Sequence, residues 1–312
     1  MKAQMKSHDE TTHQAVLKSE VLEFLSAKQG GFFLDCTFGG GGHTIALLEA
    51  NPNNRVVGLD RDDHALKRGE SLVQGYQGRL ELRKASFSEL DSLLYEHAFT
   101  GVLADLGLSS DQLAEGRGFS FSDATPLDMR MDPEQFKTAD EIVNKLDQFS
   151  LLRILRQGGV AREAVAVSRA IINNRPINDT KHLAEVVTKA AQGRSSKKKI
   201  HPATLTFQAI RMAVNEEIEE LEALLSTAPK MLRSSGRLAV ITFHSLEDKL
   251  VTKRMRHWQS GEGRPALWRS LEPEVDTRLG SFLTGKAVVP GPQEVKDNPR
   301  SRSARLRVFE FN

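Results

Sequence analysis

The 312-residue chain contains a single cysteine, Cys36, which excludes an internal disulfide framework. A chain with so little cysteine fits a reducing compartment, and we expect a cytoplasmic protein. Neither Cys-x-x-Cys nor His-Glu-x-x-His occurs and the nine histidines are scattered, so no metal site is expected. No run of about twenty apolar residues is present either, which argues against a membrane partner.

The chain also lacks an excess of charge of either sign. Its 43 lysines and arginines nearly balance 41 aspartates and glutamates, which gives a net charge of +2. A nucleic-acid partner would therefore have to be met by local basic patches, and two exist, in residues 189–201 and 298–307. We expect their cations to contact RNA phosphates, although a charge run is more often only a solvated face. The candidate contacts are Arg194, Lys197, Lys198, Lys199, Arg300 and Arg302.

Glycine is concentrated in residues 39–42, which follow an apolar run and Asp35. Glycines let a ligand approach the backbone closely, and the N–H groups of a following helix face that ligand. A dinucleotide fingerprint would place a third glycine where Thr44 stands. An acid at a strand end followed by Gly-x-Gly resembles the first motif of S-adenosylmethionine (SAM) methyltransferases. We therefore favour SAM, with a nicotinamide-dependent dehydrogenase on the same sheet type as the alternative.

Three more apolar runs, in residues 55–60, 80–85 and 100–105, end in polar residues or lead into polar loops, as strands of an open α/β sheet do beside their ligand. Asp60 should accept hydrogen bonds from the two ribose hydroxyls, with capping of the next helix as the alternative. Phe87 is placed to lie against adenine, with ordinary core packing as the alternative. Asp105 ends the last of these runs and opens into a polar loop that contains Gln112.

Helical spacing of apolar residues replaces the strand pattern after this loop, in residues 139–146, 150–156, 162–173, 180–191 and 202–225. Strand patterns return in residues 235–243 and 304–311. The sequence thus predicts an α/β fold, a doubly wound, Rossmann-like sheet of the class I SAM-dependent methyltransferase type with an inserted helical domain. The methyltransferase domain would comprise residues 1–112 and 216–312, and the substrate-recognition insertion residues 113–215.

His244 follows the first returning strand, so we expect it to face the pocket and to hold a substrate base. The alternative is that a helix begins there with Ser245 as its N-cap and Asp248 at the third helical position, and that His244 merely precedes it.

Eight blocks of this chain match one family: residues 35–43 (DCTFGGGGH), 105–112 (DLGLSSDQ), 117–121 (RGFSF), 126–132 (PLDMRMD), 201–204 (HPAT), 207–211 (FQAIR), 243–248 (FHSLED) and 298–304 (NPRSRSA). They make the chain similar, over nearly its whole length, to the bacterial MraW/RsmH family of ribosomal RNA methyltransferases.

The resemblance implies SAM-dependent methylation of the exocyclic N4 of one cytidine in the decoding region of 16S ribosomal RNA, in the small ribosomal subunit. The family's SAM contacts carry over onto Gly41, Gly42, His43, Asp60, Phe87, Asp105 and Gln112. A SAM-binding RNA module without catalysis is the alternative from another class. The sequence leaves open whether the protein is a monomer or a homodimer.

A cytosine amino group is a poor nucleophile, because its lone pair is delocalised into the ring. An enzyme must place N4 in line with the methyl group and must supply an acceptor for the amino proton. Asp105 with its neighbouring carbonyls is the candidate acceptor, and His244 is the second candidate catalytic residue. Methylation at C5 of a pyrimidine would need an attacking thiolate, whereas Cys36 lies inside the glycine turn, where packing is its expected role.

Overall fold

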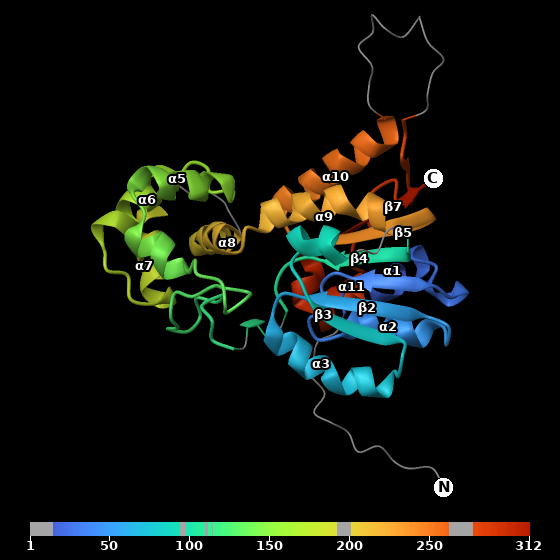
Figure 1. The fold of residues 1–312 in the computed structure, drawn as a ribbon. Helices are drawn as coiled ribbons and strands as arrows, with labels where there is room; N and C mark the ends of the chain where they lie inside the picture. The colour runs from blue at the N-terminus through green and yellow to red at the C-terminus, as the bar shows by residue number, and fades with distance from the viewer. Residues whose placement is uncertain (1–14, 94–97, 110–111, 114, 192–200, 262–276) are drawn as a thin grey trace, which may run out of the picture.

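A computed structural model describes residues 15–93, 98–109, 112–113, 115–191, 201–261 and 277–312 (Figure 1). Within them, seven strands form one sheet in the order β3-β2-β1-β4-β5-β7-β6. The first five strands along the chain pair in parallel, and β7 and β6 are antiparallel to their neighbours. The strands are β1 Phe32–Asp35, β2 Arg55–Asp60, β3 Leu80–Lys84, β4 Phe99–Asp105, β5 Leu232–Thr242, β6 Gly280–Phe282 and β7 Arg305–Phe311.

Helices cover both faces of the sheet. On one face lie α1 (Lys18–Phe24), α2 (Gly42–Ala50) and α3 (Asp63–Gly75), and on the other lie α9 (Glu217–Met231) and α10 (Ser245–Ser260) (Figure 1). The shorter elements are the 3₁₀ turns η1 (Ala27–Gln29), η2 (Phe87–Leu93) and η5 (Pro299–Ser303), and the helix α11 (Pro292–Asp297).

The central strands β1 and β4 are mostly apolar, and both of their faces are buried. Successive residues of β1 and β4 enter different cores. Leu34 and Val102 pack with α9 and α10, whereas Phe33 and Leu103 pack with α1 and α2. Such continuous apolar runs are typical of parallel strands covered by helices on both sides. The parallel register also brings the polar carboxyl ends of these strands to one edge.

A helical lobe stands to one side of the sheet and has a hydrophobic core of its own, built from residues between Leu127 and Val214 (Figure 1). It contains the π-helical turn η3 (Glu141–Lys145) and four α-helices: α5 (Gln148–Gln157), α6 (Ala164–Asn173), α7 (Thr180–Ala191) and α8 (Pro202–Asn215). Gly158 allows α5 and α8 to approach closely, since a Cβ there would lie 2.2 Å from Cβ of Ala209.

The expected single helix over residues 202–225 is wrong, because the chain breaks at Glu216 into α8 and α9. Glu216 has a left-handed backbone with φ of 52°. The buried side chain of Asn215 fixes this corner, donating from Nδ2 to the carbonyl of Met129 and accepting at Oδ1 from the N–H of Met131, each at 2.7 Å. The break lets α8 belong to the lobe while α9 packs on the sheet.

Strand β6 was not expected from the sequence. It has three residues, too few for a period-two pattern, and it forms because the edge of β7 offers unpaired backbone groups. In the described part of the chain, no helix is both long and apolar enough to cross a membrane.

Candidate active site

A cavity of about 560 Å³ opens at the carboxyl ends of β1, β2 and β4. Its walls include the glycine turn, the three strand ends, the polar loop after β4, η2, the starts of α9 and α10, and the loop around η5. The polar and charged residues among its lining include Thr37, His43, Asp60, Arg61, Ser86, Asp105, Ser109, Gln112, Glu217, Glu220, Glu247, Asp297, Asn298 and Arg300.

The glycine turn is fixed by Asp35, the last residue of β1. Its carboxylate accepts hydrogen bonds from the N–H of Thr37 at 3.1 Å and from the hydroxyl of Thr44 at 2.7 Å. Burial raises the pKa of Asp35, and His43 together with these hydrogen bonds partly offsets that rise. Thr44, which stands where a dinucleotide fingerprint has glycine, therefore anchors the turn to the strand.

Gly41 and Gly42 have different places in the turn. Gly41 is the N-cap of α2 with φ of 77°, and a Cβ there would lie 3.0 Å from Leu72 and 3.1 Å from Phe38. It is buried and does not line the cavity, whereas Gly42 does. Gly41 thus determines the backbone shape of the turn without contacting the cavity, while Gly42 lines the cavity.

Asp60 ends β2 and points its carboxylate at the glycine turn. Its Oδ2 accepts from the N–H of Gly39 at 2.8 Å, and its Oδ1 accepts from the N–H of Asp62 at 2.9 Å. The alternative that Asp60 caps the next helix is wrong, because Asp62 is the N-cap and accepts from the N–H of His64. Burial raises the pKa of Asp60 to about 6, and the two N–H donors limit this rise.

Asp105 and His43 form a pair at the centre of the cavity. His43 Nε2 lies 3.4 Å from Asp105 Oδ2, and the side chains are 6% and 15% exposed. Burial opposes protonation of His43, but Asp105 and Asp35 outweigh it, so that the pKa of His43 is raised. The 3.4 Å contact lacks hydrogen-bond geometry, so Nε2 of His43 is buried without a hydrogen-bond partner. His43 Nδ1 and Asp105 Oδ1 are also buried without one.

Phe87 and Gln112 also line the cavity. Carboxylates accept hydrogen bonds from Gln112 itself and from the neighbour of Phe87. Ser88, next to Phe87, donates from its N–H and its hydroxyl to Glu220 of α9, at 3.0 and 2.8 Å. The Gln112 amide donates to Asp62 at 3.3 Å and accepts from the N–H of Ser109 at 3.1 Å. The adenine and polar-loop residues expected from the sequence therefore line the same cavity as His43 and Asp60.

His244 is placed differently from both expectations. It is itself the N-cap of α10: its Nδ1 accepts from the N–H of Glu247 at 3.4 Å, and Glu247 Oε2 accepts in return from the N–H of His244 at 3.2 Å. Ser245 is not the cap. Phe243 and Glu247 line the cavity, but His244 does not. The imidazole thus orients Glu247.

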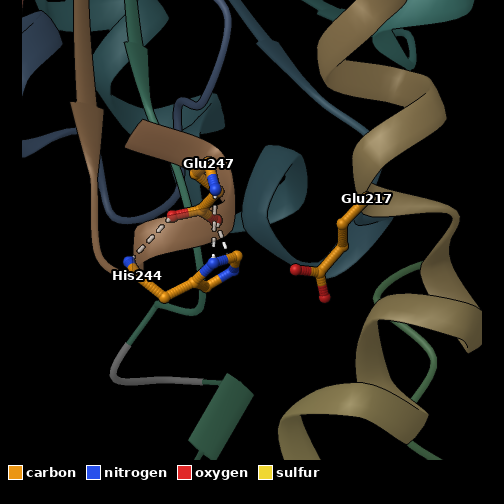
Figure 2. A group of neighbouring side chains, drawn as sticks. All are labelled: Glu217, His244 and Glu247. Carbon is orange, nitrogen blue, oxygen red and sulfur yellow. Dashed lines mark hydrogen bonds and ion pairs between the residues drawn. The ribbon is translucent and has the colours of Figure 1, made fainter. Parts of the chain in front are cut away.

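Glu217, His244 and Glu247 offer potential ligand atoms within 4.8 Å of one another, a composition that metal sites use (Figure 2). The Arg211 guanidinium already pairs with both carboxylate oxygens of Glu217, at 2.7 and 2.8 Å. Because Nδ1 of His244 accepts a backbone N–H, the neutral ring carries its proton on Nε2, which lies 3.1 Å from Glu247 Oε1. These contacts describe an ionic network that joins α8, α9 and α10.

Glu247 is the most buried carboxylate of this network, with its side chain 4% exposed. Burial alone would raise its pKa. His244, the N–H of Phe243 and the charge of Arg211 outweigh that effect, so the pKa of Glu247 is lowered and the group is ionised at neutral pH.

Of the basic candidates, Arg300 lines the cavity and Arg302 lies on the exposed side of η5. Arg194, Lys197, Lys198 and Lys199 lie outside the described residues. Sequence reasoning missed Glu217, Glu220 and Glu247. The available signal for Glu217 and Glu220 was the acid-rich start of α9, which a helix dipole explains equally well. Glu247 lies within residues 243–248, one of the blocks that match the family.

The cavity suits SAM in size, charge and polar groups. Its volume falls in the range of small-molecule sites, and its carboxylates outnumber its cations, which suits a ligand with a net positive charge such as SAM. The unpartnered polar atoms of His43 and Asp105 point to a polar ligand. Together with the strand order, this site defines a class I SAM-dependent methyltransferase.

The chain belongs to the MraW methylase family, which it matches over residues 10–312. Two relatives are named ribosomal RNA small subunit methyltransferase H. The protein from Thermomicrobium roseum is 43% identical, and that from Synechococcus elongatus is 40% identical; each alignment covers 96% of this chain and 94% of the relative. The dehydrogenase alternative is therefore wrong, and the SAM-dependent assignment is confirmed.

Among solved structures, an rRNA methylase from Streptococcus thermophilus has a TM-score of 0.39 and 12% identity, with 94% of each chain covered. The family assignment comes from the sequence relatives and not from this likeness.

Proposed function

We propose that this enzyme methylates the exocyclic N4 of one cytidine in the decoding region of 16S ribosomal RNA, within the small ribosomal subunit and in the cytoplasm. The relatives named for the small-subunit RNA support the substrate class. The observation that carries the reaction type is the partly buried carboxylate of Asp105, with one buried and unpartnered oxygen, at the end of β4 in the cavity.

The residues proposed to hold SAM surround that carboxylate. Asp60 binds the ribose hydroxyls, Phe87 lies against the adenine, and Gln112 fixes the polar loop. Gly42 and His43 meet the charged end of the ligand, and Gly41 supports them through the shape of the turn. SAM itself supplies an electrophilic methyl group on its sulfonium.

Asp105 is proposed to accept a hydrogen bond from the cytosine amino group and to take its proton as positive charge develops on N4. The N–H of Asp105 donates to Thr37 Oγ1 at 2.7 Å, which holds the strand end against the glycine turn. His43 Nε2 lies 3.4 Å from this carboxylate, and the carboxylates of Asp105 and Asp35 raise the pKa of His43 against the effect of burial. His244, which orients Glu247, serves as a positioning residue.

Residues 113–215 are proposed to form the RNA-recognition insertion, while residues 1–112 and 216–312 form the methyltransferase domain. Arg300 at the cavity and Arg302 beside it are proposed to contact phosphates, as are Arg194, Lys197, Lys198 and Lys199. Such contacts position RNA without selecting sequence. Selection of one cytidine then comes from RNA shape and from splaying the base into the cavity.

The test uses methyl-labelled SAM with small ribosomal subunits that lack the modification, followed by mapping of the labelled nucleotide. We expect label at one cytidine of the decoding region, and none with subunits that are already modified. Label at another nucleotide, or SAM binding without any transfer, would contradict the proposed function. The second result would establish the non-catalytic module instead.

A further inference from the structure

A second cavity, of about 570 Å³, lies on the helical lobe and shares no lining residue with the first. It is formed along α7, which Figure 1 shows on the side of the lobe away from the sheet. Its lining consists of Phe121, Lys181, Ala184, Glu185, Thr188, Lys189 and His201.

One wall of this cavity is aromatic and fixed. The rings of Phe121 and His201 are stacked, with centroids 5.1 Å apart and planes at 23°. Phe207, a buried residue of the lobe core, also packs edge-on with Phe121, with ring centroids 5.1 Å apart. His201 caps α8 through Nδ1, which accepts from the N–H of Ala203, so its neutral ring has a donor at Nε2.

The rim of the cavity is basic. Lys181 and Lys189 are exposed on α7, and their spacing of eight residues puts them on one face of the helix, about two turns apart. Glu185 lies midway between them and is an acceptor suited to the amino group of a base. The sequence that follows α7, outside this site, adds four cations and no acid before His201.

We propose that this cavity binds a single-stranded nucleotide of the substrate RNA, at a position distinct from the target cytidine. The base stacks on the aromatic wall that Phe121 and His201 form, and the phosphates on either side lie near Lys181 and Lys189. Aromatic platforms beside lysines are how proteins bind splayed RNA bases. This inference rests on the proposed function, since it takes the substrate to be RNA.

The experiment measures the dissociation constant of a fluorescein-labelled RNA oligonucleotide with the decoding-region sequence, by anisotropy over a series of salt concentrations. The full-length variants are Phe121→Ala, Phe121→Trp and the double variant Lys181→Gln/Lys189→Gln. Lys145→Gln is the matched control, because Lys145 is an exposed lysine of the same lobe and does not line the cavity.

We expect Phe121→Ala to weaken RNA binding by about 5- to 150-fold, the range for loss of one stacked base. The double lysine variant should lower the slope of log affinity against log salt by about 1.4, for two phosphate contacts at ~0.7 each. Phe121→Trp should keep the affinity and show quenching on RNA addition beyond that of wild type, whose two tryptophans supply the background. Lys145→Gln and SAM binding should be unchanged.

Unchanged affinity and salt slope in the alanine and lysine variants would overturn the proposal. The folded Phe121→Trp variant provides an independent test, since absence of added quenching would overturn it even if Phe121→Ala misfolds. Normal RNA binding with slower methylation of assembled subunits would assign the cavity to a ribosomal protein and would also overturn it. Failure of the proposed function is distinguishable, because then wild type itself transfers no methyl group to 16S RNA.

Discussion

His43, the second residue of α2, places Nε2 3.4 Å from Oδ2 of Asp105, the last residue of β4. The two elements meet because β1 and β4 pair in parallel and because the glycine turn returns the chain over the ends of both. The imidazole of His43, whose pKa is raised, thus lies beside a partly buried carboxylate where SAM and the substrate base would meet.

Asp105→Asn removes the carboxylate and nearly preserves its shape. With SAM saturating, we expect the single-turnover rate of methyl transfer to fall by about 10²- to 10⁴-fold, the usual contribution of a positioned general base. Asp91→Asn is the matched control, because Asp91 is an exposed acid of η2 and lies outside the cavity. Normal turnover by Asp105→Asn would remove this carboxylate as a required base.

Asp60 should make SAM affinity depend on pH. Burial raises the pKa of Asp60 in the ligand-free protein to about 6, so the carboxylate proposed to accept hydrogen bonds from the ribose hydroxyls is lost as the pH falls through 6. We expect the SAM dissociation constant, measured by calorimetry from pH 5 to 8, to rise below pH 6 in wild type. The Asp60→Asn variant should bind weakly at every pH and lack this step.

Protonation of Asp60 should weaken SAM binding but stabilise the ligand-free fold. Because folding raises the pKa of Asp60 from 3.8 to about 6, the ligand-free fold holds a proton there that the unfolded chain has released. The stabilisation of the fold by this bound proton is complete below pH 3.8 and is lost as the pH rises through 6. It is worth at most about 3 kcal/mol. Urea unfolding of wild type and Asp60→Asn at pH 4 and pH 7 measures it; equal pH dependence in both would contradict the assignment.

Gly41→Ala tests the shape of the turn. Alanine must adopt φ of 77° and would press its Cβ against Leu72 and Phe38. We expect a loss of about 1–2 kcal/mol or more in unfolding free energy, and weaker SAM binding. Gly75→Ala is the control, since a Cβ there meets nothing within 4 Å and should be neutral or stabilising. Equal stability of the two variants would contradict the turn's role.

Arg211→Met tests the ionic network beside α10. Arg211 and Glu217 are 17% and 10% exposed, so removing the guanidinium leaves Glu217 with an uncompensated charge near Glu247. We expect the free energy of unfolding to fall by about 3–5 kcal/mol. Lys137→Met breaks the exposed pair with Glu216 and should cost less than about 1 kcal/mol. A similar small effect from both would show that the network does not stabilise the fold.

Much of the part of the site proposed to bind SAM could be predicted from the sequence. Buried parallel strands are visible as apolar runs in the sequence, and aspartates stand at the ends of these runs. Asp35, Asp60 and Asp105 were each expected at a strand end, and each lies there. The glycine turn was identifiable for the same reason, since few residues other than glycine adopt positive φ.

The substrate side could not be predicted in the same detail. Glu217, Glu220 and Glu247 reach the cavity from helices whose apolar spacing reports only their buried faces. The break at Glu216 was missed because the apolar period continues across it. His244 was not recognised as a cap because serine, which follows it, is the commoner N-cap residue.

Methylation at the amino nitrogen of cytidine is tested by the chemical identity of the labelled nucleoside. Small-subunit RNA methylated by wild type with labelled SAM would be digested to nucleosides and separated by chromatography with mass detection. We predict all label in N4-methylcytidine. Label in 5-methylcytidine or in a ribose-methylated nucleoside would contradict the account.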